Sequence, residues 1–256
     1  MYFRTLPAWA NVAIFMLMPM RRRRDQLSLA LAPRFGWGGA RRGAGRTPGA
    51  RPPVHHRSRP ALRPSAPCHV TLRIARGLPS LRTPGFVRAF EDTLARGCER
   101  GAFRVVHYSL QRDHVHMLVE ADDANALGRG MMSVGCRLAR TFNRVFRRKG
   151  RVLGDRYHVR TMTTPREVRN ALAYVLLNFR KHHAQADSPP RHIAVGPDPA
   201  SSGRWFDGWT PAAMGGEDKP APRCVARARS WLLRVGWRRH GLIGTSETPS
   251  GRSLRR

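Results

Sequence analysis

Acidic side chains are scarce in this sequence, and lysine is nearly absent. The 256 residues include 16 Asp and Glu against 47 Lys and Arg, a formal net charge of +31, and only three of the basic residues are lysine. An arginine excess of this size points to a polyanionic partner, for which nucleic acid is the default. An arginine-biased genome would explain the preference for arginine over lysine, but it explains the shortage of acids less well.

Cysteine is also scarce. The sequence has four scattered cysteines without a C-x-x-C pair: Cys68, Cys98, Cys136 and Cys224. This pattern argues against a zinc knuckle and against a disulfide framework, and it is typical of proteins from a reducing compartment. We therefore expect a cytoplasmic protein, and its positive charge leads us to expect that it is associated with the nucleoid.

No apolar stretch near the N-terminus is long enough to span a membrane. A span needs about 20 apolar residues, whereas the run over residues 6–20 is shorter and contains Pro7 and Pro19. Four arginines follow this run at 21–24, but a signal peptide carries its positive charges ahead of the apolar part. We expect no membrane partner, and we expect residues 1–20 to be translated upstream of a genuine start at Met20.

The next segment, residues 21–67, holds twelve arginines and one acid, and it is rich in glycine and proline. It shows no apolar periodicity, and such a segment cannot bury enough surface to fold alone. We therefore predict that residues 1–67 form a disordered basic arm. The arm either tracks a phosphate backbone or minor groove, or it is a solvated tail without a fixed target; the composition fits both.

Periodic structure begins at His69. Alternating apolar residues predict strands at 70–74, 103–110, 114–121 and 157–163, and helical spacing predicts helices at 84–99 and 124–149. A third helix should run from Thr164 to about residue 183, because Thr164, Pro165 and Glu167 form a helix-start signal. The order strand–helix–strand–strand–helix–strand–helix predicts an α+β fold over residues 68–186, a ferredoxin-like (RRM-like) antiparallel sheet with helices.

From residue 187 to 256 the chain is rich in proline and glycine, and we predict a loop followed by a short basic helix over residues 223–239. An aromatic cluster, WFDGW, lies at 205–209. It could stack on nucleic-acid bases, but packing back onto the domain is the expected role.

The most informative motif is the pair His114 and His116 in the apolar run HVHMLV. Residues two apart on a strand point to the same side of a sheet, so the two imidazoles share one face. Val115 and Met117 take the other face, which we expect to pack on helices. Two imidazoles make half of a metal site, although a strand histidine pair is more often solvent-facing or satisfied in the core.

A second polar pair lies on the third predicted helix. Tyr174 and Asn178 are one helical turn apart, and they lie off the apolar stripe of that helix, on the same line as Glu167, Asn170 and Lys181. By itself this position is that of an ordinary surface tyrosine.

Three segments together resemble a known family, over about residues 69–183. They are DHVHMLVE after the strand FRVVHYSLQ, the stretch GDRYHVR, and the helix TPREVRNALAYVLLNFRKH with its Tyr-x-x-x-Asn spacing. The combination resembles the HUH-type single-tyrosine transposases, and most closely the REP-associated tyrosine transposases and related small insertion-sequence transposases. That family usually has asparagine before the first histidine, where this sequence has Asp113.

The resemblance implies a metal-dependent endonuclease and strand transferase that acts on single-stranded or hairpin DNA during transposition. It implies that Tyr174 is the nucleophile, that a covalent phosphotyrosine forms, and that His114, His116 and Asn178 bind a divalent metal, Mg²⁺ or Mn²⁺. Related insertion-sequence enzymes act as dimers while REP-associated relatives can act alone, so a homodimer is left open.

Basic residues along and after the second long helix are candidates to hold the DNA, with a solvated helix face as the alternative. They are Arg137, Arg140, Arg144, Arg156 and Lys181.

Two other functions fit parts of the sequence. A non-catalytic nucleic-acid-binding protein, either domesticated or RRM-like, would suit the charge, but RRM domains stack bases on aromatic residues of their central strands and the strand 114–121 has none. A metallohydrolase could use the histidines without a covalent step. Tyr108 and Tyr157 are rival nucleophiles, and neither has an amide one helical turn away. The residues do not identify a general base; Lys181 and His182 are weak candidates.

Overall fold

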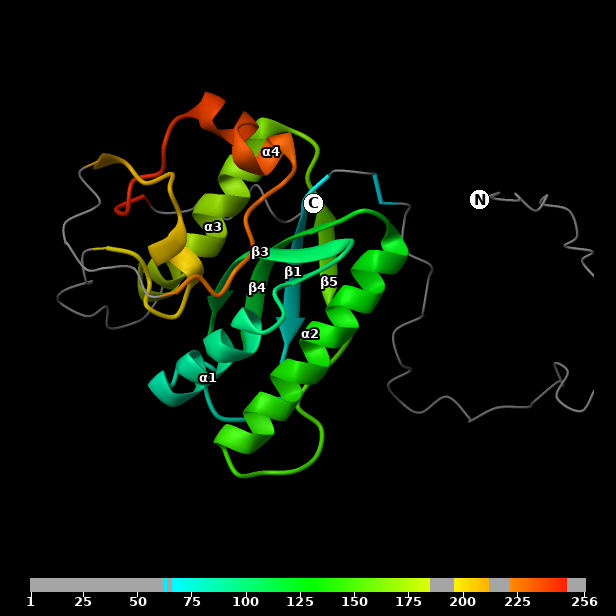
Figure 1. The fold of residues 1–256 in the computed structure, drawn as a ribbon. Helices are drawn as coiled ribbons and strands as arrows, with labels where there is room; N and C mark the ends of the chain where they lie inside the picture. The colour runs from blue at the N-terminus through cyan, green and yellow to red at the C-terminus, as the bar shows by residue number, and fades with distance from the viewer. Residues whose placement is uncertain (1–61, 64–65, 185–195, 212–221, 248–256) are drawn as a thin grey trace, which may run out of the picture. The chain divides into compact units, whose positions relative to one another are not determined.

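The structure is a computed structural model that describes residues 62–63, 66–184, 196–211 and 222–247, with side chains up to residue 179 in the second range. The chain divides into two compact units, Met1–His56 and Arg57–Arg256. The first unit lies outside the described residues, and so do the expected start at Met20 and nearly all of the predicted basic arm. The second unit carries the fold shown in Figure 1.

The described part of this unit has five strands, three long helices and several shorter helical turns. In chain order they are β1 (Cys68–Arg73), α1 (Pro84–Ala95), β2 (Glu99–Arg100), β3 (Phe103–Leu110), β4 (His114–Ala121), α2 (Ala124–Val145), β5 (His158–Thr161), α3 (Pro165–Ala184), η1 (Ser202–Trp205), α4 (Trp231–Arg234) and η3 (Gly236–His240). The strands predicted at 103–110 and 114–121 are confirmed. The short β2 was not predicted, and α2 ends before residue 149 because Arg147 has a φ of 47°, which a helix cannot continue through.

The strands form one antiparallel sheet in the order β2-β3-β4-β1-β5. β3 and β4 are a hairpin, and β1 lies between β4 and β5 although it comes first in the chain. Cys68 pairs with Val119 and Arg73 pairs with His114, so β1 runs along the histidine strand from residue 114 to residue 119. This topology confirms the predicted ferredoxin-like α+β fold.

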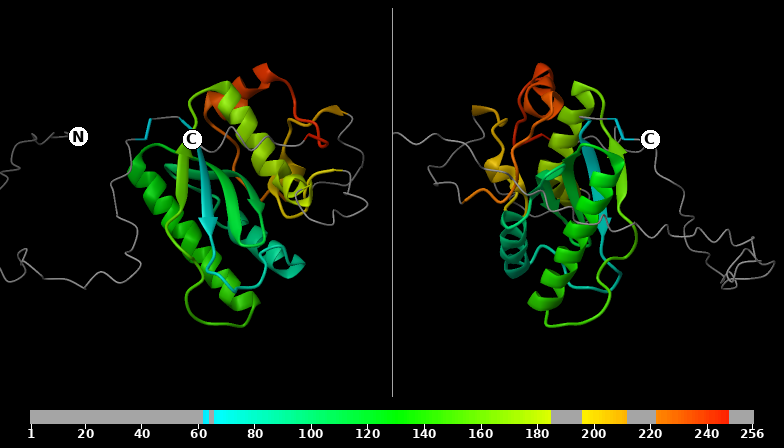
Figure 2. Two further views of the ribbon diagram at one scale, coloured as in Figure 1. Left: turned by 180° about the vertical axis from the view of Figure 1, so that it is seen from behind. Right: turned by 45° about the vertical axis from the view of Figure 1, so that its right-hand side comes forward.

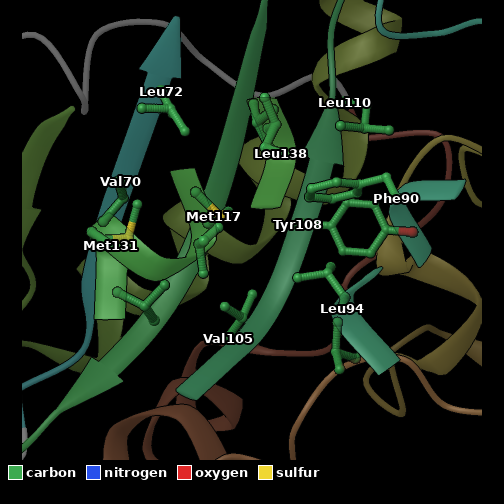
Figure 3. Packing of buried hydrophobic residues seen from close by; sticks show 14 of the residues in the cluster. Val70, Leu72, Phe90, Leu94, Val105, Tyr108, Leu110, Met117, Met131 and Leu138 are labelled. Atoms are coloured by element: carbon green, nitrogen blue, oxygen red, sulfur yellow. The ribbon is translucent and has the colours of Figure 1, made fainter. Parts of the chain in front are cut away.

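One face of the sheet packs against α1 and α2. Val115, Met117 and Val119 are buried in this core, as predicted for the apolar side of β4. Figure 3 shows Met117 and Tyr108 among the surrounding apolar side chains. The Tyr108 ring packs edge-on against Phe90, with ring centroids 5.3 Å apart. Full burial of each large apolar side chain contributes about 1.5–3 kcal/mol, so this layer supplies much of the stability.

The other face of the sheet carries α3, which begins with the predicted capping box. The Glu167 backbone N–H donates to Thr164 Oγ1 at 3.2 Å, and the Thr164 N–H donates to Glu167 Oε2 at 3.2 Å. Leu118 of β4 packs in the same buried cluster as Val168, Leu172 and other residues of α3. The views in Figure 2 show α2 and α3 on different sides of the sheet.

The C-terminal segment, described over residues 196–211 and 222–247, covers the outer side of α3. Phe206, Trp209, Leu233 and Trp237 are buried in the cluster that α3 forms. The expectation that the aromatic cluster packs back onto the domain is therefore confirmed. The predicted helix over 223–239 is wrong: two short turns, α4 and η3, occupy its second half, and the chain before them runs along the sheet, where the Ala226 N–H donates to Val105 O at 2.9 Å.

An ion pair holds the start of the C-terminal segment in place. Arg82 donates to both carboxylate oxygens of Asp198 at 2.7 Å and to Leu110 O at 2.9 Å. Asp198 is fully buried, and a buried carboxylate is stable only when it is paired in this way.

His107 on β3 predicts how stability depends on pH. It is buried, its Nδ1 lies 3.1 Å from Ser202 Oγ, and burial, with a smaller effect of Arg223, lowers its pKa to about 3. In the unfolded chain the pKa is about 6.5. Between pH 6.5 and pH 3, the unfolded state binds a proton at this histidine and the folded state does not. The contribution of His107 to the stability of the folded state is therefore complete above pH 6.5 and decreases as the pH falls toward 3.

Urea unfolding between pH 8 and pH 5 should show a free energy of unfolding that is flat above pH 7 and declines below 6.5. His69, whose pKa is lowered to about 4, adds a decline of the same sign. The variant His107→Gln should lose about half of the decline, since it removes one of the two groups. An unchanged pH dependence in His107→Gln would contradict the assignment.

Candidate functional site

His114 and His116 lie on the α3 side of β4, and their side chains converge. The two Nε2 atoms are 3.0 Å apart, and the rings meet edge-on with centroids 4.6 Å apart. His116 is 4% exposed and His114 is half-buried, so the pair lies where the sheet surface opens toward solvent.

The outer nitrogen of His114 is held by its neighbour in sequence. His114 Nδ1 lies 2.7 Å from Asp113 Oδ1. An ionised carboxylate only accepts hydrogen bonds, so Nδ1 carries the proton and the Nε2 lone pair is available. The histidine bond and the Arg73 charge hold the pKa of Asp113 below its usual range, against the opposing effect of burial. The aspartate that departs from the family pattern therefore orients the first histidine.

The outer nitrogen of His116 faces β1. His116 Nδ1 lies 3.1 Å from His69 Nε2 and 3.1 Å from Thr71 Oγ1. Burial, and to a smaller extent the charges of His158, Arg160 and His114, lower the pKa of His69 to about 4, so His69 is neutral at pH 7.

His69 and Thr71 were not among the site residues predicted from the sequence. Each is adjacent to a site histidine only through the pairing of β1 with β4. The alternation of His69 and Thr71 on one side of a strand was the single available signal, and it does not say which strand lies alongside.

Tyr174 approaches the histidines from α3. Its ring centroid is 5.0 Å from that of His116 and 5.7 Å from that of His69, edge-on in both cases. Asn178, one turn further along the helix, is 1% exposed. The structure thus brings His114, His116 and Tyr174 together. It also shows that the polar line on α3 passes from the half-buried Tyr174 to the buried Asn178.

The rival tyrosines are placed differently. Tyr108 is buried in the α1–α2 core, where its hydroxyl donates to Glu91 Oε1 at 2.8 Å. Burial, together with Cys224 and Glu91, raises the pKa of Tyr108 far above its usual value. Tyr157 packs, partly buried, against the same core. Neither position suits a nucleophile that acts beside the two histidines.

The candidate DNA-binding residues are dispersed. Arg137, Arg140 and Arg144 project from α2 on the side of the sheet that faces away from Tyr174, where they line two neighbouring hollows of about 260 and 340 Å³ with Arg100. Arg156 is exposed on the chain before β5. The Lys181 side chain lies outside the described residues.

The donor set can be compared with what a metal ion requires. Two ligands at adjacent corners of an octahedron, each about 2.1 Å from the ion, are about 3.0 Å apart, and this is the separation of the two Nε2 atoms. Among the described residues, no group of three His, Cys, Asp or Glu is arranged to hold a metal. The third ligand implied by the resemblance is Asn178, whose side chain is an amide and so is not one of these four residue types.

Comparison with known proteins gives a family likeness for the part of the chain that carries this site. Residues 69–176 match the family model described as "Transposase IS200 like". This part of the chain is therefore similar to the IS200-like transposases, and the resemblance expected from the sequence is confirmed. A transposase is an enzyme that acts on DNA. No curated protein matches the sequence significantly. None of the helices in the described ranges is long and apolar enough to cross a bilayer.

Solved structures give weaker likenesses. A REP-associated tyrosine transposase bound to a REP hairpin is 12% identical, covers 50% of this chain and 74% of its own, and has a TM-score of 0.39. A presumed transposase from Deinococcus radiodurans is 16% identical, with 43% and 87% coverage and a TM-score of 0.33. A bacterial tRNA(His) guanylyltransferase-like protein in complex with GTP is 15% identical, with 52% and 73% coverage and a TM-score of 0.37. These likenesses do not bear on function, and the family assignment rests on the sequence match.

Proposed function

We propose that the protein is a metal-dependent single-strand DNA endonuclease and strand transferase that works through a covalent phosphotyrosine. The observation that carries the proposal is the convergence of His114 and His116, with Nε2 atoms 3.0 Å apart, beside the Tyr174 ring, 5.0 Å from that of His116. A nucleophile and a pair of metal-ligating nitrogens are the two parts that a phosphodiester transfer needs at one place.

We assign His114, His116 and Asn178 as the residues that hold Mg²⁺ or Mn²⁺. When bound, the ion withdraws charge from a phosphate oxygen and so makes the phosphorus a better electrophile. Asp113 behind His114, and Thr71 and His69 behind His116, hold both rings so that their Nε2 atoms face the site. Neutral ligands of this kind leave the positive charge of the ion largely uncompensated.

Tyr174 then performs the transfer. Its phenolic oxygen attacks the phosphorus, the bond to one sugar oxygen breaks, the phenol proton is lost, and the departing oxygen gains a proton. The phosphotyrosine keeps the energy of the broken bond, so a strand hydroxyl can later attack it and release the tyrosine. A free phenol has a pKa of about 10, so the proton must be removed during the attack.

The proposed substrate is single-stranded or hairpin DNA, because a target phosphate must reach a site on a sheet surface that α3 partly covers. The arginines of α2 are proposed to hold a further part of the DNA backbone from the other side of the sheet, and Arg156 and Lys181 are retained as additional contacts. The arginine side chains suit this role because they bind phosphate oxygens with two parallel donors.

The first prediction concerns the covalent step. Incubated with hairpin DNA labelled at the 5′ or 3′ end and with Mg²⁺ or Mn²⁺, the wild-type protein should form an adduct that survives denaturation. Tyr174→Phe should form none, since it lacks the attacking oxygen, and His116→Ala should form none because a ligand is lost. Tyr157→Phe, the same chemical change outside the site, is the matched control and should keep the adduct.

The other outcomes are equally informative. An adduct in Tyr174→Phe would contradict the nucleophile assignment. Cleavage by the wild-type protein without an adduct would indicate a metallohydrolase, and binding without cleavage would indicate a non-catalytic nucleic-acid-binding protein.

The second prediction concerns the metal. In calorimetric titration with Mn²⁺, His114→Ala should show no binding at the site, and Asp113→Ala should bind about 10–100-fold more weakly, since partners behind a ligand contribute that much to affinity. His240→Ala, which removes an exposed histidine of η3, should bind as the wild type does. Equal affinities in all four proteins would exclude these residues as the metal site.

The third prediction concerns α2. Arg140 and Arg144 are both exposed, and replacing both with glutamine should weaken DNA binding and flatten its dependence on salt. Each lost phosphate contact lowers the slope of log affinity against log salt by about 0.7 on a single strand. The double variant Arg88→Gln/Arg227→Gln removes two exposed arginines elsewhere, and its slope should stay close to that of the wild type. Equal slopes in the two double variants would contradict a specific role for α2.

A further inference from the structure

The sheet face that carries the two histidines continues past them onto β1 and β5. Residues paired directly across an antiparallel sheet point to the same face. Arg73 of β1 pairs with His114, and Thr71 pairs with His116 on one side and with His158 of β5 on the other. Arg73, Thr71 and His158 therefore share the face of the site.

This part of the face is open. Arg73 and His158 are exposed and Thr71 is half-buried, whereas Leu118 and His107 on the β3–β4 side are buried. In the left view of Figure 2, β1 and β5 lie uncovered toward the viewer, while α3 crosses to the side of β4 and β3. Solvent and substrate can thus reach the histidines from the β1–β5 side.

The open part of the face is positively charged. No acidic side chain of the described residues forms an ion pair with Arg73, and the carboxylate of Asp113 nearby is already bonded to His114. Arg160, two residues after His158 on the same face, is paired with Glu167 at 3.1 Å, so its charge is compensated. Arg73 is therefore the exposed cation nearest in register to the histidine pair.

We propose that Arg73 and His158 form a phosphate-binding rim that holds the backbone of the substrate strand next to the phosphate under attack. The inference rests on the proposed function, and it adds the direction from which the strand enters, across β5 and β1 toward β4. Adjacent strands lie about 4.8 Å apart, so the rim and the histidines are within the span of neighbouring nucleotides. The contact is to phosphate, because the arginine fork matches two phosphate oxygens and exposed imidazole donates one hydrogen bond.

The test combines variants of the rim with substrates that lack one backbone charge. Single-stranded hairpin DNA is prepared with one neutral methylphosphonate at each position around the cleavage site, and binding is measured for the wild type, Arg73→Gln, His158→Gln and Arg88→Gln. Arg73→Gln should bind unmodified DNA about tenfold more weakly. At one position the methylphosphonate should weaken binding to the wild type and have no further effect on Arg73→Gln. His158→Gln should behave in the same way at a neighbouring position.

Arg88→Gln removes an exposed arginine from α1 and is the matched control, which should respond to every methylphosphonate as the wild type does. Arg73→Lys should recover part of the lost affinity, since it restores the charge without the fork. Unchanged Mn²⁺ affinity and unchanged thermal unfolding in Arg73→Gln would separate this role from a structural one. The proposal is overturned if no position loses its effect in Arg73→Gln, or if Arg73→Gln and Arg88→Gln bind alike.

The outcomes also separate this inference from the proposed function. If the wild-type protein forms the phosphotyrosine adduct but no methylphosphonate loses its effect in Arg73→Gln, the proposed function stands and the rim is excluded. If one methylphosphonate does lose its effect in Arg73→Gln but no adduct forms, the enzymatic proposal is excluded and the rim stands as a DNA-binding surface.

Discussion

The pairing of β1 with β4 is the constraint on which the site depends. In the observed register, Thr71 lies opposite His116 and Arg73 lies opposite His114. A slip by one residue would move Val70 and Leu72 to the site face and bury Thr71 and Arg73 in the core, at a large cost in apolar burial. The hydrophobic core between the sheet and α1–α2 therefore enforces the arrangement of polar groups on the opposite surface.

The second constraint is the position of α3 between the sheet and the C-terminal segment. Apolar contacts with Trp237 and Phe206 cover the outer side of the helix, and Arg169 bonds to both carboxylate oxygens of Glu247 at 3.0 and 2.8 Å. A helix held on two sides keeps Tyr174 in a defined place relative to His116. The proposed role of Tyr174 as a nucleophile requires this placement, because small displacements of a nucleophile reduce the rate strongly.

The proposed catalytic residues and part of the positive charge lie on opposite faces of the sheet. The histidines and Tyr174 lie on one face of the sheet, whereas Arg137, Arg140 and the neighbouring arginines of α2 lie on the other. A DNA molecule that contacts both surfaces must pass around an edge of the sheet, because the packed core lies between them. The open edge next to the histidines is β5, and this is where the proposed rim lies.

Much of this molecule followed from local patterns in the sequence. Strand alternation predicted both faces of β4, the Thr164–Glu167 signal predicted the start of α3, and the Tyr-x-x-x-Asn spacing placed Tyr174 and Asn178 one turn apart; each of these depends on residues close together in the chain. The predicted helix at 223–239 failed because the segment follows the packing of buried residues such as Val225 and Trp237 rather than a helical periodicity. Only the tertiary structure decided that His69 and Thr71 support His116, that Asn178 is buried, and that the α2 arginines face away from the site. These facts depend on which strands pair and which surfaces meet, and long-range packing sets both.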